Sequence, residues 1–196
     1  MVIGFVDIKN KLQKIGRFEL LNQSAVNLYD NFRKILENLD PKPKKVLEIG
    51  TFYGISTIIL ASICEEVNTI DVNYQEATEF VWKLFNVREK INYWIEADRS
   101  AIKRRINTLE YDFVFIDAVH SYEAVKADYE MVKNCKSILF HDNYERSPGV
   151  VRFLTEKSAQ KLAEFGYIGL NKVKGNYNFN YSELMRLRKS NAFKLQ

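Results

Sequence analysis

Short apolar runs alternate with amphipathic stretches along most of this 196-residue chain, and that alternation limits the fold more than any other feature. The runs have strand length, and the stretches between them repeat apolar residues at three- and four-residue steps, as helices do. This order predicts a parallel sheet with right-handed crossovers and helices on both faces. The predicted strands are Lys45–Ile49, Val67–Ile70, Ile91–Ile95, Phe113–Ile116 and Ser137–Phe140, and the predicted helices are Ser56–Cys64, Gln75–Phe85, Ser100–Leu109, Tyr122–Val132 and Val150–Phe165.

Both ends of the chain add to this pattern. Apolar residues recur at helical spacing from Leu20 to Leu39, which predicts an amphipathic helix. The sequence Asp-Pro-Lys-Pro at residues 40–43 stops it, because proline cannot continue a helix. Near the other end, Tyr167–Val173 and Tyr177–Tyr181 flank a turn, so they predict a terminal antiparallel strand pair.

We therefore expect one α/β domain over residues 41–196, with a Rossmann-like, doubly wound and mostly parallel sheet, after a helical extension over residues 1–40. Hydrophobic residues make up 46% and charged residues 28% of the chain, which excludes a disordered protein. No apolar stretch approaches the roughly 20 residues of a membrane helix, and Met1 to Val6 lacks the features of a signal peptide. A cytoplasmic protein without a membrane partner is predicted, with Cys64 and Cys135 as reduced core thiols.

The segment VLEIGTFYGIST places Gly50 and Gly54 in the turn between the first strand and its helix. A residue without a Cβ lets the backbone approach a ligand there, although glycines also serve plain packing in a tight connection. The GxGxxG pattern of dinucleotide-binding turns is absent, which disfavours a nicotinamide or flavin cofactor.

Acidic residues follow the second and third predicted strands. Asp71 follows the glycine turn by about 20 residues, where nucleotide-binding α/β folds place an acid on ribose hydroxyls, and its alternative role is to cap the next helix. Asp98 lies in the segment Glu96-Ala97-Asp98-Arg99 that follows the third strand, with a cap on the helix from Ser100 as its alternative role.

Two further strand ends carry both histidines of the chain. Asp117 and His120 follow the fourth strand, and His141, Asp142 and Asn143 follow the fifth. Because the carboxyl ends of parallel strands share one edge of the sheet, where such folds bind ligands, these side chains are predicted to converge in a catalytic site.

Together these motifs resemble class I S-adenosylmethionine-dependent methyltransferases. The form E-x-G-x-x-x-G-x-S, from Glu48 to Ser56, is similar to the catechol and caffeoyl-CoA O-methyltransferases. The run IDAVHSYEAVKADYE, including Tyr122 and Asp128, also resembles the sugar and antibiotic O-methyltransferases. The resemblance covers roughly residues 44–153 and departs from the family at residues 134–136, where a glycine pair is missing before the fifth strand.

The resemblance implies S-adenosylmethionine as cofactor. By it, Glu48 contacts the amino group of this methyl donor, Ser56 holds its carboxylate, Asp71 its ribose and Asp98 its adenine. The residues predicted to bind the cofactor are Glu48, Gly50, Thr51, Tyr53, Gly54, Ser56, Asp71, Asp98 and Arg99.

The resemblance also implies a divalent cation. Asp117, Asp142 and Asn143 match the family's metal ligands, and three oxygen donors suit Mg²⁺ or Mn²⁺. The relatives have a lysine base three residues after the aspartate, where this chain has His120, so His120 and Asp117 are the predicted catalytic residues. The alternative is that Asp142 caps the helix at Ser147-Pro148 and Asn143 is an ordinary turn residue.

The resulting hypothesis is O-methylation of a small hydroxylated molecule, such as a sugar or phenol, with the helical extension over residues 1–40 on the acceptor side. The extension and the terminal strands also offer surface for a homodimer. One alternative is a nucleic-acid methyltransferase, but the net charge of +4 is mild and no Asn-Pro-Pro-aromatic motif follows the fourth strand. Basic clusters at residues 103–105 and 186–194 are typical of a solvated face. The other alternative is a binding protein for S-adenosylmethionine without turnover.

Overall fold

The computed structural model describes residues 2–21, 26–135, 137–143, 147–157, 160–161 and 166–171, with the backbone alone for 26–31, 142–143, 160–161 and 166–171. Their strands form one sheet in the order β3-β2-β1-β4-β5-β7-β6. Neighbouring strands from β3 to β5 are parallel, β7 is antiparallel to β5, and β6 is antiparallel to β7. The strands are β1 Lys45–Ile49, β2 Glu66–Asp71, β3 Ile91–Ile95, β4 Phe113–Ile116, β5 Ser137–Asn143, β6 Gln160–Lys161 and β7 Gly166–Asn171.

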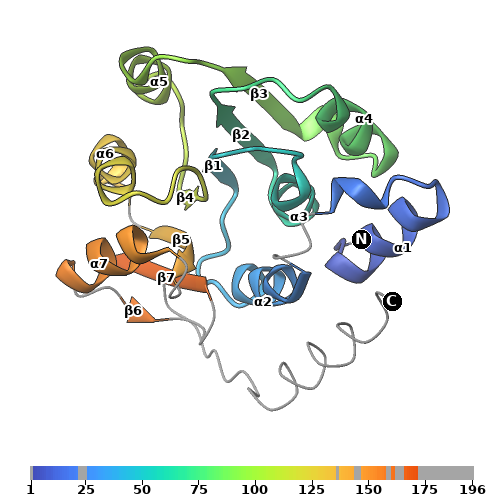
Figure 1. The fold of residues 1–196 in the computed structure, drawn as a ribbon, viewed down its shortest axis with the longest axis horizontal. Coiled ribbons are helices and arrows are strands. Elements are labelled where there is room, and N and C mark those ends of the chain that lie inside the picture. The colour runs from blue at the N-terminus through green and yellow to red at the C-terminus, as the bar shows by residue number, and fades with distance from the viewer. Residues whose placement is uncertain are drawn as a thin grey trace.

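Helices cover both faces of the sheet, as Figure 1 shows, and the predicted doubly wound α/β fold is confirmed. Alternate residues of each strand point to opposite faces. On β1, Val46 therefore packs with α1 to α4, and Leu47 packs with α5 to α7. The helices are α1 Phe5–Lys14, η1 Phe18–Leu20, α2 Val26–Glu37, α3 Ile55–Ile63, α4 Glu76–Leu84, η3 Arg88–Lys90, α5 Arg99–Ile106, α6 Tyr122–Val132 and α7 Pro148–Glu156.

The N-terminal helices differ from the prediction of one helix from Leu20 to Leu39. The α2 helix begins at Val26, residues 22–25 lie outside the described part of the chain, and Leu20 ends the short η1 turn. The α1 helix was not predicted, although its apolar residues at three- and four-residue steps bury one face. Both helices belong to the core that covers α3, so this extension is packed onto the domain rather than separate from it.

The C-terminal elements also differ from the prediction. The α7 helix ends at Glu156 instead of Phe165, because its buried stripe ends at Leu154 and the next positions on that face are polar. The short strand β6 occupies part of the predicted helix, and β7 takes the place of the predicted strand Tyr167–Val173. The partner strand predicted at Tyr177–Tyr181 lies outside the described residues.

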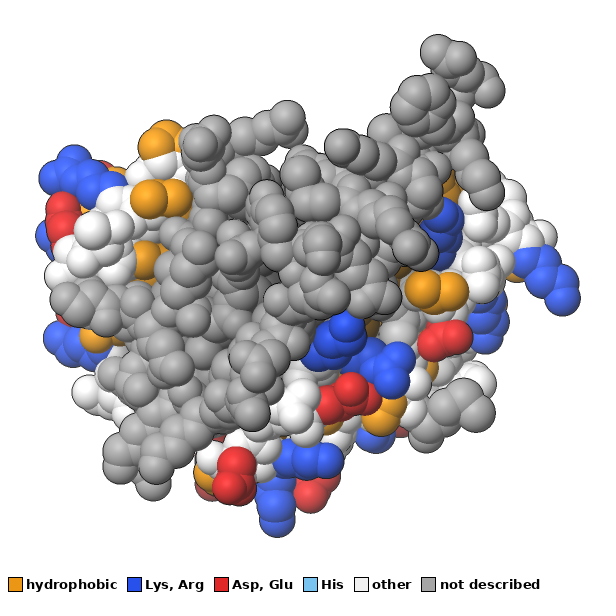
Figure 2. Space-filling model, turned by 90° about the horizontal axis from the view of Figure 1, so that it is seen from below, with side chains coloured by type: hydrophobic (Ala, Val, Ile, Leu, Met, Phe, Trp, Pro, Cys, Tyr) orange, Lys and Arg blue, Asp and Glu red, His pale blue; other side chains and the backbone are white. Residues whose placement is uncertain are grey.

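Charged side chains of both signs lie intermingled along the lower edge of the face shown in Figure 2. Lys103 and Arg104 are exposed on α5, whereas the basic cluster at residues 186–194 lies outside the described residues. Among the described helices, none has the length and hydropathy to cross a membrane.

Candidate active site

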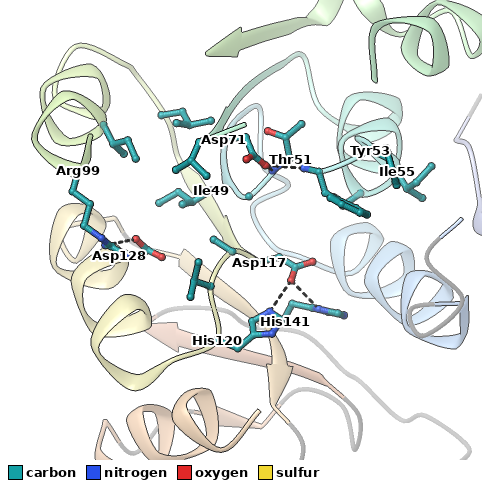
Figure 3. A pocket seen from close by; sticks show the side chains of 18 of the residues that line it. Ile49, Thr51, Tyr53, Ile55, Asp71, Arg99, Asp117, His120, Asp128 and His141 are labelled. Atoms are coloured by element: carbon teal, nitrogen blue, oxygen red, sulfur yellow. Dashed lines mark hydrogen bonds and ion pairs between the residues drawn. The ribbon is translucent and has the colours of Figure 1, made fainter. Parts of the chain in front are cut away.

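A cavity of about 350 Å³ opens at the carboxyl ends of the central strands (Figure 3). Its walls come from the β1–α3 turn, the end of β2, the segment after β4, His141 of β5, and the helices α5 and α6. Leu20 of the N-terminal extension completes the lining. The site therefore lies where parallel α/β sheets bind their ligands, and the extension contributes to it.

Different contacts require the two glycines of the β1–α3 turn. Gly50, at φ +100°, lines the cavity, and a Cβ there would clash with the backbone carbonyl of Asp117. Gly54, at φ +72°, lies outside the cavity lining, and a Cβ there would clash with the indole of Trp82, which donates a hydrogen bond to the Gly54 carbonyl (3.1 Å). Close packing against the Trp82 side chain therefore explains Gly54. Close packing against the backbone that follows β4 explains Gly50.

Asp71 faces the cavity and also holds the glycine turn. Its Oδ2 accepts hydrogen bonds from the backbone N–H groups of Thr51 and Phe52, both at 2.8 Å. The N-cap of α4 is Gln75, so the alternative role of Asp71 as a helix cap is wrong. Two amide donors on one oxygen keep this carboxylate in place at the strand end.

Glu48 lies beneath the turn rather than in the cavity lining. Its side chain is fully buried, and its two oxygens accept hydrogen bonds from the hydroxyls of Ser56 (2.5 Å), Thr57 (2.5 Å) and Thr69 (2.7 Å). Ser56, Thr51 and Tyr53 do line the cavity. The geometry therefore gives Glu48 a role in fixing the turn, and its predicted contact with a ligand amino group has no counterpart in the cavity.

Burial raises the pKa of Glu48 from its usual 4.5 to about 7, and the three hydroxyl donors only partly offset that rise. The folded state then binds a proton more tightly than the unfolded state. The stabilisation from this group is fully present below about pH 4.5 and is lost as the pH rises to about 7.

We expect Glu48→Gln, which cannot ionise, to remove this dependence. As the pH rises from about 5 to 8, the free energy of unfolding should fall further in the wild type than in the variant, by up to about 3 kcal/mol. Urea unfolding at several pH values measures both slopes. Parallel slopes for the two proteins would show that Glu48 does not titrate in this range.

The histidines and Asp117 form a cluster on the opposite side of the cavity from Asp71 (Figure 3). The Nδ1 atom of His141 lies 3.1 Å from Oδ1 of Asp117, and Nε2 of His120 lies 3.6 Å from the same oxygen. The side chain of His141 is 6% exposed and that of His120 is 41% exposed. His141 therefore orients the carboxylate from below, while His120 is open to an incoming molecule.

Asp142 and Asn143 are the last residues of β5, which is longer than predicted because it continues its pairing with β7 to Asn143. Their side chains lie outside the described residues. The N-cap residue of α7 is Ser147, and the alternative that Asp142 caps this helix concerns a side chain outside the described part of the chain. Among the side chains that are described, no group of three or more potential ligands forms a metal site.

At the end of β3 the structure separates two neighbours that were predicted together. Asp98 is the N-cap of α5 and accepts hydrogen bonds from the backbone N–H groups of Ser100 (3.3 Å) and Ala101 (3.0 Å), outside the cavity lining. Arg99 lines the cavity and forms an ion pair with Asp128 of α6 (2.8 Å).

Asp128 is a cavity residue that the sequence prediction did not assign to the site. It lies on the buried stripe of α6, between Val125 and Val132. A carboxylate at an apolar position of an amphipathic helix was the available signal, because acidic residues are rarely buried without a partner.

Comparison with known proteins gives the class. A family model described as a methyltransferase domain matches residues 47–144, half of the chain, so the chain belongs to this family. A probable caffeoyl-CoA O-methyltransferase of Dictyostelium discoideum is 33% identical over 90 residues, which cover 41% of this chain and 36% of the relative. The chain thus spans about a third of the length of that curated relative.

Solved structures share the fold. An O-methyltransferase from Bacillus cereus in complex with SAH matches with a TM-score of 0.53 at 19% identity, covering 83% of this chain and 87% of that one. The O-methyltransferase TomG from Streptomyces achromogenes, involved in tomaymycin synthesis and in complex with SAM, matches with a TM-score of 0.52 at 16% identity, covering 84% and 86%. At this identity the likeness concerns the fold.

Proposed function

We propose that this chain is an S-adenosylmethionine-dependent O-methyltransferase that acts on a small hydroxylated molecule, of the phenol or sugar class. The observation that carries the proposal is that the Asp117–His120–His141 cluster and the carboxylate of Asp71 line the same cavity. The names of the relatives support the choice of oxygen as acceptor, since they are called O-methyltransferases.

The donor would occupy the cavity lengthwise. Its ribose hydroxyls would bind Asp71, whose oxygens keep acceptor capacity beyond their backbone contacts. Its amino-acid part would lie along Gly50, near Ser56 and Tyr53. This placement puts the sulfonium methyl group close to the histidine cluster.

The chemistry is a displacement at the methyl carbon. The acceptor oxygen forms a bond to that carbon, the carbon–sulfur bond breaks, and the donor leaves as a neutral thioether. The hydroxyl proton passes to Nδ1 of His120, because Nε2 faces the carboxylate of Asp117, which stabilises the resulting imidazolium. His141 holds Asp117 in position.

We also propose a divalent cation at the same strand ends. The parallel pairing of Ile116 with Phe140 puts Asp117 level with His141, one residue before Asp142. Asp117, Asp142 and Asn143 would supply the oxygen ligands that Mg²⁺ prefers. When bound, the ion would supply positive charge that lowers the pKa of a nearby acceptor hydroxyl.

Transfer of a deuterated methyl group tests the proposed function. The protein is incubated with labelled donor, Mg²⁺ and a panel of phenols and sugars, and mass spectrometry locates the label. We expect label on an acceptor oxygen, loss of transfer in chelator, and recovery on adding Mg²⁺. The variant Asp142→Ala should behave like chelation.

Other results would contradict specific parts of the proposal. Label on nucleic-acid nitrogen alone would favour a nucleic-acid methyltransferase. Donor binding without transfer to any acceptor class would favour a binding protein without turnover. Full activity in excess chelator would remove the cation and leave His120 as the activating group.

A further inference from the structure

The Arg99–Asp128 pair forms the end of the cavity that the proposed chemistry does not use (Figure 3). Arg99 begins α5 and Asp128 lies in the middle of α6, and Nη1 of Arg99 is 2.8 Å from Oδ1 of Asp128. The Asp128 side chain is 6% exposed, whereas that of Arg99 is 49% exposed. The carboxylate is therefore deep in the wall, and the guanidinium holds it from the rim.

One oxygen of this carboxylate is available to a ligand. Arg99 occupies Oδ1, and within the described part of the chain Oδ2 accepts no hydrogen bond. Burial raises the pKa of Asp128, and the positive charge of Arg99 opposes that rise. Since a buried carboxylate is costly when its acceptor sites are unfilled, an oxygen on the cavity wall suits a ligand that donates hydrogen bonds.

Part of the cavity lining is apolar. Val72, Ile102 and Val119 line the cavity, and Val72 and Val119 are exposed to it rather than buried in the core. A cavity that combines apolar side chains with a hydrogen-bond acceptor in its wall suits a flat ring with an amino group on its edge. Asp98, the residue predicted for such an edge, has both oxygens engaged in the cap of α5.

We propose that Oδ2 of Asp128 accepts a hydrogen bond from the exocyclic amino group of the donor's adenine, and that the Arg99–Asp128 pair thereby selects adenine. This inference rests on the proposed function. With the methyl group at the histidine cluster and the ribose at Asp71, the base extends toward this end of the cavity. The ion pair with Arg99 keeps the Asp128 carboxylate ionised, so that it can only accept hydrogen bonds. A base with an oxo group in place of the amino group would therefore bring its own oxygen against Oδ2, and the two oxygens would repel each other.

The test compares S-adenosylhomocysteine with S-inosylhomocysteine, in which an oxo group replaces the amino group, by isothermal titration calorimetry. The wild type should prefer the adenine compound by at least about 10-fold, as expected when one buried partner is left without its hydrogen bond. In Asp128→Asn, the amide oxygen can stay on Arg99 while the amide NH₂ faces the cavity as a donor. That variant should bind the two compounds within about 2-fold of each other, or should prefer the inosine compound.

The ratio of two affinities on one protein is insensitive to a loss of folded protein, and circular dichroism verifies that Asp128→Asn is folded. An unchanged adenine preference in this variant overturns the inference and leaves the proposed function intact. Loss of the preference in Asp98→Asn, with Asp128→Asn unchanged, would assign the adenine edge to Asp98 instead. Failure of the wild type to bind either compound would overturn the inference together with the donor assignment.

Discussion

Replacing His120 with alanine is expected to lower the rate of methyl transfer by about 10²–10⁴-fold, the usual effect of removing a general base. Donor affinity should change little, because the proposed donor contacts through ribose and amino-acid part involve Asp71 and the β1–α3 turn rather than His120. Stability should also be nearly unchanged, since the side chain is 41% exposed. Steady-state rates and calorimetric donor affinity separate these effects.

Two controls make this prediction specific to proton transfer. Added imidazole should restore part of the rate in His120→Ala, because it can occupy the vacated space and accept the proton. The variant His120→Lys places an amine where the resembling methyltransferases have their lysine, so it should retain more activity than His120→Ala. Wild-type turnover in His120→Ala would exclude His120 from the mechanism.

Substitution of Gly50 by alanine is expected to destabilise the protein strongly and to abolish donor binding. The new methyl group would clash with the backbone of Asp117, which is packed against Gly50. Backbone strain of about 1–2 kcal/mol at positive φ and a comparable overpacking penalty together predict a loss of about 2–4 kcal/mol in the free energy of unfolding. Melting curves should show no rise on adding S-adenosylhomocysteine.

Gly16 offers a matched control for the backbone strain. Its φ is +70°, and a Cβ built there has nothing within 4 Å. Gly16→Ala should therefore lose only about 1–2 kcal/mol and should keep donor binding. Equal stability of the two alanine variants in urea unfolding would show that contact with Asp117 is not what requires a glycine at position 50.

The strands and the strand-end residues could be predicted from the sequence because both depend on local patterns. Each of the five parallel strands is a short apolar run, and the pairing of Ile116 with Phe140 follows from the βαβ order. That order was enough to bring Asp117, His120 and His141 to one edge. Residues that end neighbouring parallel strands meet whatever the details of helix packing.

Other parts depended on contacts that no local pattern contains. Glu48 was predicted to face the ligand, but hydroxyls from α3 and β2 engage it beneath the turn. Asp98 and Arg99 are neighbours in the chain, yet only Arg99 lines the cavity, because the helix cap occupies the Asp98 side chain. Asp128 joined the site through the packing of α6 beside α5, which motif spacing does not specify.

Calorimetric titration of the wild-type protein with S-adenosylhomocysteine tests the central claim most directly, with a nicotinamide dinucleotide titrated in parallel. The cavity predicts one binding site of micromolar affinity for S-adenosylhomocysteine, a rise in melting temperature as expected for a ligand selective for the folded state, and no heat from the dinucleotide. Folded protein that gives no heat with S-adenosylhomocysteine, or that binds the dinucleotide instead, would contradict the assignment of this cavity to a methyl donor.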